Sequence, residues 1–317
     1  MSSLFFSSSS GVAGRPSDRL GSKAASTSGK AADVVPTVPL GTSGNLRSGR
    51  ARTLRARLTE RDMAVLRSLA SFRLMTGRQL QQLHITSDQP ATSARRGRAV
   101  LKRLTELGAV VRLERQIGGE HGGSESLIYT LSGLGQSVLA LDADSDVHVP
   151  RGRMIWDTKP AFQNHLLAIA DLYVELHALD AQGQLELLQF ETEPAAWRWF
   201  AGPAGGRQAV KPDAFVALGV GDFEQQAFVE IDRGTESRPT IARKCRRYVD
   251  YWQSGQEQQR SGVFPKVWWL TSKPRWAARI ADVIASLPAA HQPLFGVGLA
   301  AQGAELLRRL DDAGGQP

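Results

Sequence analysis

Acidic residues stand at the ends of two apolar segments that lie close together in the sequence. Asp213 precedes the apolar run 214–218, and Glu230 and Asp232 close the run that begins at residue 227. Runs at this separation, joined by a short glycine-containing segment, are typical of a β-hairpin that brings these carboxylates to one sheet edge. Carboxylates gathered in this way either bind a divalent cation or have raised pKa values. The spacing therefore predicts a metal-dependent site that cleaves phosphodiesters.

Composition sets the broad class of the protein. The chain has 317 residues and a formal net charge of +8, and this length allows two domains and tails. Its single cysteine, Cys245, excludes an internal disulfide and a cysteine-based zinc cluster. No stretch reaches the roughly 20 apolar residues that span a bilayer, and the N-terminus lacks a signal-peptide pattern. We therefore expect a cytoplasmic protein with no membrane partner.

The basic charge is concentrated at the front of the chain. Residues 1–57 contain nine basic and two acidic residues, whereas 136–317 contain nineteen basic and twenty-two acidic residues. A basic segment attracts the phosphate backbone of nucleic acid. The acidic surplus of the rear half suits a metal site better than a second nonspecific contact with DNA.

Shifts in composition divide the chain into five segments. The first is rich in Ser, Gly and Ala with scattered arginines, which is typical of disorder; either DNA binding or solubility alone explains its charge. An Asp-rich stretch followed by Pro and Gly is typical of a linker. The expected segments are a disordered basic tail at 1–56, a DNA-binding domain at 57–142, a linker at 143–160, a second domain at 161–302 and a C-terminal tail at 303–317.

The first of these domains has the pattern of a winged helix-turn-helix, with three helices and a two-stranded wing. A final helix over 134–141 either closes the domain or supports a homodimer. The expected helices begin at Thr59, Thr76 and Ser93, and the expected strands are 109–113 and 127–131, on either side of a glycine-rich tip at 118–123.

The third of these helices has two distinct faces at 100° per residue. Its leucines gather on one side, and its basic residues gather on the other. These basic residues are Arg95, Arg96, Arg98, Lys102 and Arg103. A solvated basic face is the ordinary alternative, but this helix is the one that the motif inserts into the major groove. The pattern therefore favours contact with double-stranded DNA.

The second domain reads as a helix, three strands, a helix, a strand, a helix and a strand, so the fold class is α+β or α/β. This α-β-β-β-α-β order, with its acidic positions, resembles the PD-(D/E)xK nuclease superfamily. The resemblance implies that Asp213 and Glu230 hold Mg²⁺ or Mn²⁺. It also implies a lysine two residues after the glutamate, where this chain has Asp232.

Two substitutes for the missing lysine are open. Lys244 stands on the next helix beside a buried stripe that includes Tyr248, and Asp232 can serve instead as another metal ligand. His165 and Glu191 are candidates for accessory roles at the same site. A third reading is that these charged groups form an ion-pair network in a degenerate domain.

Both halves together resemble the replication-relaxation family of actinobacterial plasmids and integrative elements. The matching motifs are Leu58-Thr59-Glu60-Arg61-Asp62, Asn164-His165, Lys211-Pro212-Asp213-Ala214, and the string 228–236 that contains Glu230 and Asp232. The family implies a role in plasmid DNA replication or relaxation. Three functions fit: a magnesium-dependent DNA nickase, a non-enzymatic accessory factor that works with other replication or transfer proteins, and a winged-helix transcriptional regulator.

Overall fold

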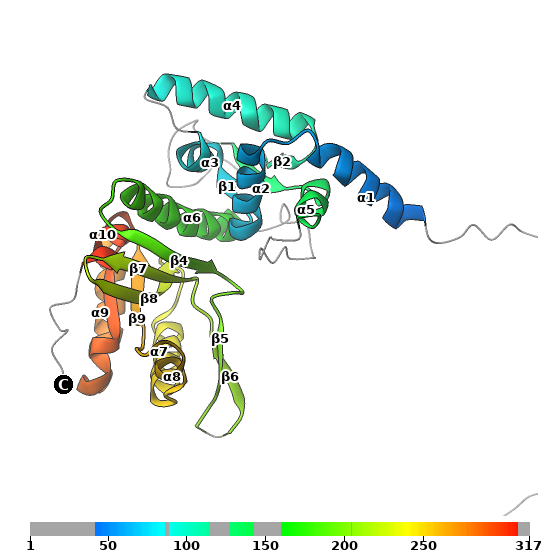
Figure 1. The fold of residues 1–317 in the computed structure, drawn as a ribbon. Coiled ribbons are helices and arrows are strands. Elements are labelled where there is room, and N and C mark those ends of the chain that lie inside the picture. The colour runs from blue at the N-terminus through cyan, green and yellow to red at the C-terminus, as the bar shows by residue number, and fades with distance from the viewer. Residues whose placement is uncertain (1–41, 86–88, 114–126, 143–159, 204, 310–317) are drawn as a thin grey trace, which may run out of the picture. The chain divides into compact units, whose positions relative to one another are not determined.

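The computed structural model describes residues 42–85, 89–113, 127–142, 160–203 and 205–309 (Figure 1). The chain divides into two units, 1–41 and 42–317, and all of the described residues belong to the second. The tail over 1–41, the tip at 118–123, nearly all of the linker and residues 310–317 lie outside the described residues. Within the described ranges, no helix has the length and apolar character needed to cross a membrane.

The front part of the described chain contains five helices and one small antiparallel sheet with strand order β1-β3-β2. The helices expected from Thr59, Thr76 and Ser93 are α2, α3 and α4, and both expected strands are present as β2 and β3. The elements are α1 (Thr42–Arg55), α2 (Glu60–Phe72), β1 (Met75–Thr76), α3 (Gly77–His84), α4 (Pro90–Glu106), β2 (Val110–Leu113), β3 (Ile128–Leu131) and α5 (Gly133–Leu139).

Capping residues explain where α2 and α3 begin. The Thr59 side chain accepts from the Asp62 amide, and the Asp62 side chain accepts from the Thr59 amide. Thr76 and Gln79 form the same reciprocal pair at the start of α3. Each pair satisfies two amides that a helix start leaves without intrahelical partners.

Helix α1 corrects the expected extent of the front tail. Residues 42–55 are helical rather than disordered, and Ala51 and Leu54 are buried. These side chains join Leu58 in the same core as Val138 and Leu139 of α5. The burial of this short apolar stripe against α5 stabilises a helix whose composition alone is typical of disorder.

The rear part is built on a five-stranded mixed sheet with strand order β10-β9-β8-β7-β4. Strands β4, β7 and β8 are antiparallel, and β8, β9 and β10 are parallel. The elements are α6 (Pro160–Ala181), β4 (Glu186–Thr192), β5 (Arg198–Ala201), β6 (Arg207–Val210), β7 (Ala214–Val220), β8 (Phe223–Asp232), α7 (Arg238–Gln253), α8 (Gln256–Ser261), β9 (Lys266–Thr271), α9 (Pro274–Ala285), η2 (Ala289–Leu294), β10 (Phe295–Leu299), η3 (Ala300–Gln302) and α10 (Gly303–Arg308). The expected mixture of helices and sheets is confirmed.

Two elements of the rear part differ from the expected order. Strands β5 and β6 form a separate antiparallel hairpin between β4 and β7. Helix α10 lies inside the segment 303–317 expected as a tail, and Ala304 and Leu307 of this helix are buried in the core. The prediction of a tail is therefore wrong for residues 303–308, because Ala304 and Leu307 pack into the hydrophobic core.

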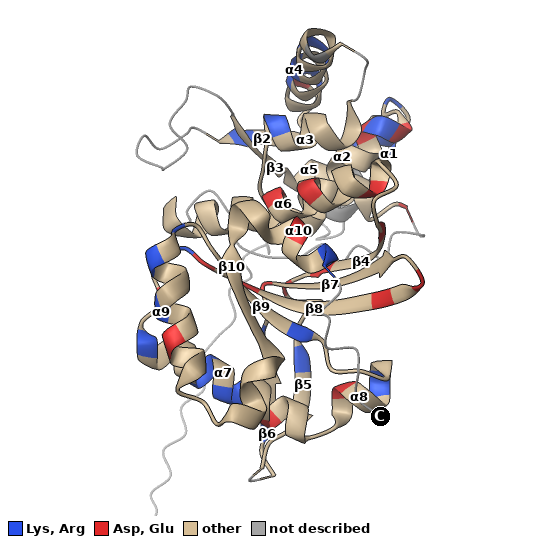
Figure 2. Cartoon of the chain, turned by 90° about the vertical axis from the view of Figure 1, so that its left-hand side faces the viewer, with Lys and Arg blue, Asp and Glu red and all other residues tan. Residues whose placement is uncertain are grey.

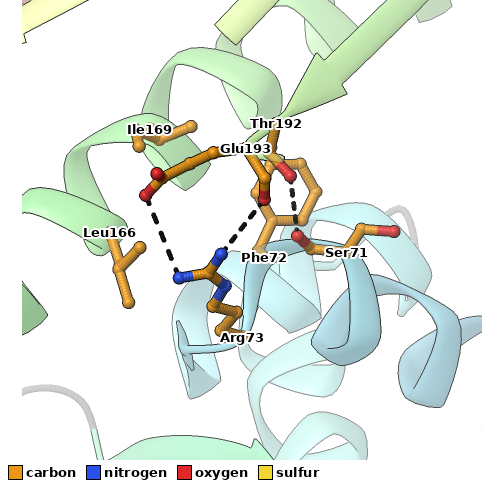
Figure 3. A pocket seen from close by; sticks show the side chains of 7 residues that line it. All are labelled: Ser71, Phe72, Arg73, Leu166, Ile169, Thr192 and Glu193. Atoms are coloured by element: carbon orange, nitrogen blue, oxygen red, sulfur yellow. Dashed lines mark hydrogen bonds and ion pairs between the residues drawn. The ribbon is translucent and has the colours of Figure 1, made fainter. Parts of the chain in front are cut away.

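Hydrogen bonds join the front and rear parts within the second unit. The Thr192 hydroxyl donates to the carbonyl of Ser71, and the Arg73 guanidinium donates to the carbonyl of Glu193 and pairs with its carboxylate (Figure 3). Gln79 of α3 donates to the Leu167 carbonyl of α6. The end of β4 and the start of α6 are thereby fixed against the helices of the front part.

Candidate functional site

Glu230 lies at the centre of the site, on the sheet face covered by α7. Its side chain is only 2% exposed, and both of its oxygens accept hydrogen bonds. The Lys244 ammonium donates to Oε2 at 2.7 Å, and the Tyr248 hydroxyl donates to Oε1 at 2.7 Å. Lys244 and Tyr248 stand one turn apart on α7, so they meet the same strand. Lys244 also donates to Glu236 at 2.6 Å.

The protonation of this cluster follows from burial and charge. Burial raises the pKa of Glu230 to about 7, against the opposing effect of Lys244. Burial disfavours the Lys244 ammonium, but Glu230, Asp213 and Glu236 outweigh that effect and raise the pKa of Lys244. Burial, together with Glu230, raises the pKa of Tyr248, which therefore remains a hydrogen-bond donor. The cluster holds a permanent cation beside a carboxyl that titrates near neutrality.

Asp213 lies next to Glu230 on the neighbouring strand, as the sequence predicts. Ala214 pairs with Val229 across β7 and β8, which places the preceding Asp213 beside Glu230. Its Oδ2 accepts from the Ile231 amide at 2.7 Å, and its Oδ1 lies 3.1 Å from Nε2 of His165 on α6. Burial disfavours the His165 imidazolium, but the hydrogen bond to Asp213 and the negative charges of Asp213 and Glu193 together outweigh burial and raise the pKa of His165.

Asp232 has a local structural role at the end of β8. Its Oδ1 accepts from the amides of Gly234, Thr235 and Glu236, and its Oδ2 accepts from Arg279 of α9 at 3.1 Å. These bonds shape the turn that leads into α7. The turn requires a glycine, because Gly234 has a φ of +82°.

The arrangement of these three carboxylates does not fit a magnesium ion. All six oxygens of Asp213, Glu230 and Asp232 already have hydrogen-bond or ion-pair partners. Within the described part of the chain, no group of three or more His, Cys, Asp or Glu side chains is placed to hold a metal ion. Mg²⁺ prefers several open oxygen ligands, so binding through Glu230 requires displacement of Lys244 or Tyr248.

Glu191 lies apart from this cluster and pairs with a different cation. Its Oε2 accepts from Arg198 of β5 at 2.8 Å, and Arg198 also pairs with the buried Glu257 of α8 at 3.7 Å. The Tyr251 hydroxyl donates to Glu257 as well. Glu191 therefore anchors the β5–β6 hairpin instead of adding a carboxylate beside Asp213.

A cavity of about 180 Å³ opens beside the Glu230 cluster, between the hairpin and α7. Its lining includes four cations, Lys211, Arg243, Lys244 and Arg247, and one carboxylate, Glu230. The angular pattern of α7 identified Lys244 but not Arg243 or Arg247. The spacing of Arg243 and Arg247, four residues apart and each beside a cavity-facing residue, is the signal that would have identified them.

Helix α4 carries a second concentration of basic residues, spread along its exposed surface (Figure 2). Arg95, Arg96, Arg98 and Lys102 are exposed, while Leu101 and Leu104 are buried. Arg103 differs from the other four, because its guanidinium pairs with the buried Asp62 of the α2 cap. Four of the five basic residues expected to contact DNA are thus free of this structural role.

Comparison with known proteins gives one match. The family model described as replication-relaxation matches residues 66–267, which is more than half of the chain. The matched segment includes α4, Asp213, Glu230 and Lys244. No curated protein and no solved structure matches the chain.

Proposed function

Because the chain belongs to the replication-relaxation family, we propose that it is a DNA-binding protein that acts in the replication or relaxation of a plasmid or integrative element. The observation that carries the proposal is the exposed basic face of α4, whose opposite face is buried in the core. Basic side chains on one face of a helix are the electrostatic footprint of a nucleic-acid-binding protein.

The arrangement around α4 supports a winged helix-turn-helix. Helices α2, α3 and α4 are followed by the antiparallel pair β2 and β3, which is the order of that motif. In this arrangement α4 is the recognition helix, and Arg95, Arg98 and Lys102 are exposed for contact with phosphates or base edges. Arg103 acts indirectly, by fixing α4 against the cap of α2.

Fluorescence anisotropy with a labelled DNA duplex tests the proposal. We expect the full chain to bind the duplex, and we expect replacement of Arg95, Arg98 and Lys102 by glutamine to weaken binding by at least tenfold. A matched control replaces three exposed arginines of the rear part, Arg246, Arg260 and Arg275. Equal loss in both triple variants would show that the α4 face has no special role.

A second candidate function is DNA nicking by a rear domain of the PD-(D/E)xK type. The neighbouring Asp213 and Glu230, with Lys244 at 2.7 Å from Glu230, favour this candidate. The hydrogen bonds that engage both carboxylates oppose it. Of the candidate functions, only DNA nicking requires Mg²⁺ or Mn²⁺ as a cofactor.

A supercoiled plasmid incubated with Mg²⁺ or Mn²⁺ separates the two candidates. Nicking by the wild-type protein that is lost in Asp213→Asn, with duplex affinity unchanged, would support an enzyme. No nicking with either metal would support an accessory factor that binds DNA and other replication or transfer proteins. Tight binding to a short palindrome that does not depend on Asp213 would favour a transcriptional regulator, for which a homodimer is the natural form.

A further inference from the structure

The β5–β6 hairpin presents aromatic and basic side chains together. Trp199 is 48% exposed, and the Arg207 guanidinium lies 4.1 Å from its ring centroid. The Lys211 ammonium lies 4.2 Å from the Trp197 ring and 5.9 Å from the Trp199 ring. An exposed aromatic face beside cations is typical of surfaces that bind single-stranded nucleic acid.

The hairpin is held in place by a buried ion-pair network. Arg198 is 4% exposed and pairs with Glu191 and Glu257. Its guanidinium also lies 4.8 Å from the Phe215 ring of β7. A buried arginine with two carboxylates and an aromatic ring fixes β5 against the sheet. The surface that carries Trp199 is therefore ordered before any partner binds, which lowers the entropic cost of binding.

Lys211 connects this surface to the basic cavity. It lines the cavity of about 180 Å³ together with Arg243, Lys244 and Arg247, and it also contacts the tryptophans of the hairpin. The one carboxylate of the lining, Glu230, is already paired with Lys244. The lining thus has an excess of positive charge, which is complementary to a phosphate group.

We propose that the hairpin and the cavity together bind single-stranded DNA, with a backbone phosphate beside Lys211, Arg243 and Arg247 and an unpaired base stacked on Trp199. This inference rests on the proposed function, because a protein that acts in DNA replication or relaxation meets single-stranded DNA. Stacking on a side chain requires an unpaired base, because the bases of a duplex are stacked on one another. A strand opened during replication or relaxation supplies such bases.

Anisotropy titrations with labelled oligothymidylate test this surface in the full chain. Removal of a stacking aromatic costs about 1–3 kcal/mol per base, so we expect Trp199→Ala to weaken binding by about 5- to 150-fold. Trp199→Phe should retain most of the affinity, because it keeps an aromatic face. Phe223→Ala is the control, since Phe223 is a 63% exposed aromatic at the start of β8, and it should change affinity less than twofold.

The phosphate contact has its own measurement. For single strands, the slope of log affinity against log salt falls by about 0.7 per lost phosphate contact. Arg243 and Arg247 are proposed to face the same phosphate, so their joint replacement by glutamine should reduce the slope by about 0.7. Arg246 lies on the same helix but is exposed and does not line the cavity. Arg246→Gln should therefore leave the slope unchanged.

The outcomes separate this inference from the proposed function. Equal affinities of Trp199→Ala and wild type for oligothymidylate would overturn the inference. Binding of the wild type to duplex DNA but not to oligothymidylate would also overturn it, but would leave the proposed function of α4 intact. Binding to neither DNA overturns both. Oligothymidylate binding that survives the triple replacement on α4 but is lost in Trp199→Ala supports a separate site for single strands.

Discussion

Lys244→Met tests the coupling between the buried carboxyl of Glu230 and its cation. In the wild type, burial raises the pKa of Glu230 from its ordinary 4.5 to about 7. The folded state therefore binds this proton more tightly than the unfolded state. The contribution of the proton to the free energy of unfolding is lost as the pH rises from 4.5 through 7. Above pH 7 the ionised carboxylate is paired with Lys244.

Removal of Lys244 takes away the charge that lowers the pKa of Glu230, so the folded variant keeps the carboxyl protonated to higher pH. For each pH unit above 7, the free energy of unfolding of the variant then falls by about 1.4 kcal/mol relative to that of the wild type. Between pH 7 and pH 8.5 the deficit of the variant should therefore grow by about 2 kcal/mol. This is an upper value, because the Lys244 side chain is 33% exposed and water screens the pair.

Urea denaturation at pH 5, 7 and 8.5, followed by circular dichroism, measures this deficit. The double variant Glu230→Gln/Lys244→Met has no titrating carboxyl at this position, so its stability relative to the wild type should depend much less on pH above 7. Lys102→Met is a control, because Lys102 also pairs with a glutamate but is 78% exposed. A deficit of Lys244→Met that stays constant from pH 7 to pH 8.5 would refute the assigned coupling.

Three further predictions concern the turn before α7, the anchor of the hairpin and the histidine beside Asp213. Gly234→Ala should lower the free energy of unfolding by about 2–4 kcal/mol in urea denaturation, because Gly234 has a positive φ and a Cβ would overlap the Trp276 ring; an unchanged midpoint would contradict this. Arg198→Met should cost about 3–5 kcal/mol, since it leaves Glu257 buried without its cation, and limited proteolysis should then cut the hairpin faster than in the wild type. The pKa of His165 is raised in the folded state, so its stabilising contribution is present at low pH and is lost as the pH rises through that pKa. His165→Gln should therefore destabilise the protein more at pH 6 than at pH 8.5. Thermal denaturation at both pH values measures this difference, and a larger loss at pH 8.5 would contradict it.

The elements that carry the site are those with a strong local pattern. The apolar runs around Asp213 and Glu230 predict β7 and β8 and their pairing, and the apolar stripe of α7 predicts that Lys244 and Tyr248 meet the sheet. Thr59 predicts the start of α2, because a capping residue acts within one turn. In each case the deciding interactions are local or lie between adjacent strands.

The missed features depend on contacts between distant segments. The β5–β6 hairpin has short strands, and its Arg198 is buried against Glu191 and against Glu257, which lies far along the chain. Asp232 resembles a ligand in sequence, but Arg279 of α9 and the turn at Gly234 engage it. The cavity draws its cations from α7 and from Lys211, which follows β6, so no single segment of the sequence reveals it.

The salt dependence of duplex binding measures whether this protein holds DNA through α4. Each phosphate contact with duplex DNA contributes about 0.9 to the slope of log affinity against log salt. With one phosphate contact for each of Arg95, Arg98 and Lys102, their triple replacement by glutamine should reduce the slope by about 2.7. The control triple in the rear part should leave the slope close to the wild-type value. A wild-type slope near zero, or an unchanged slope after the α4 replacements, would show that α4 does not hold the DNA backbone.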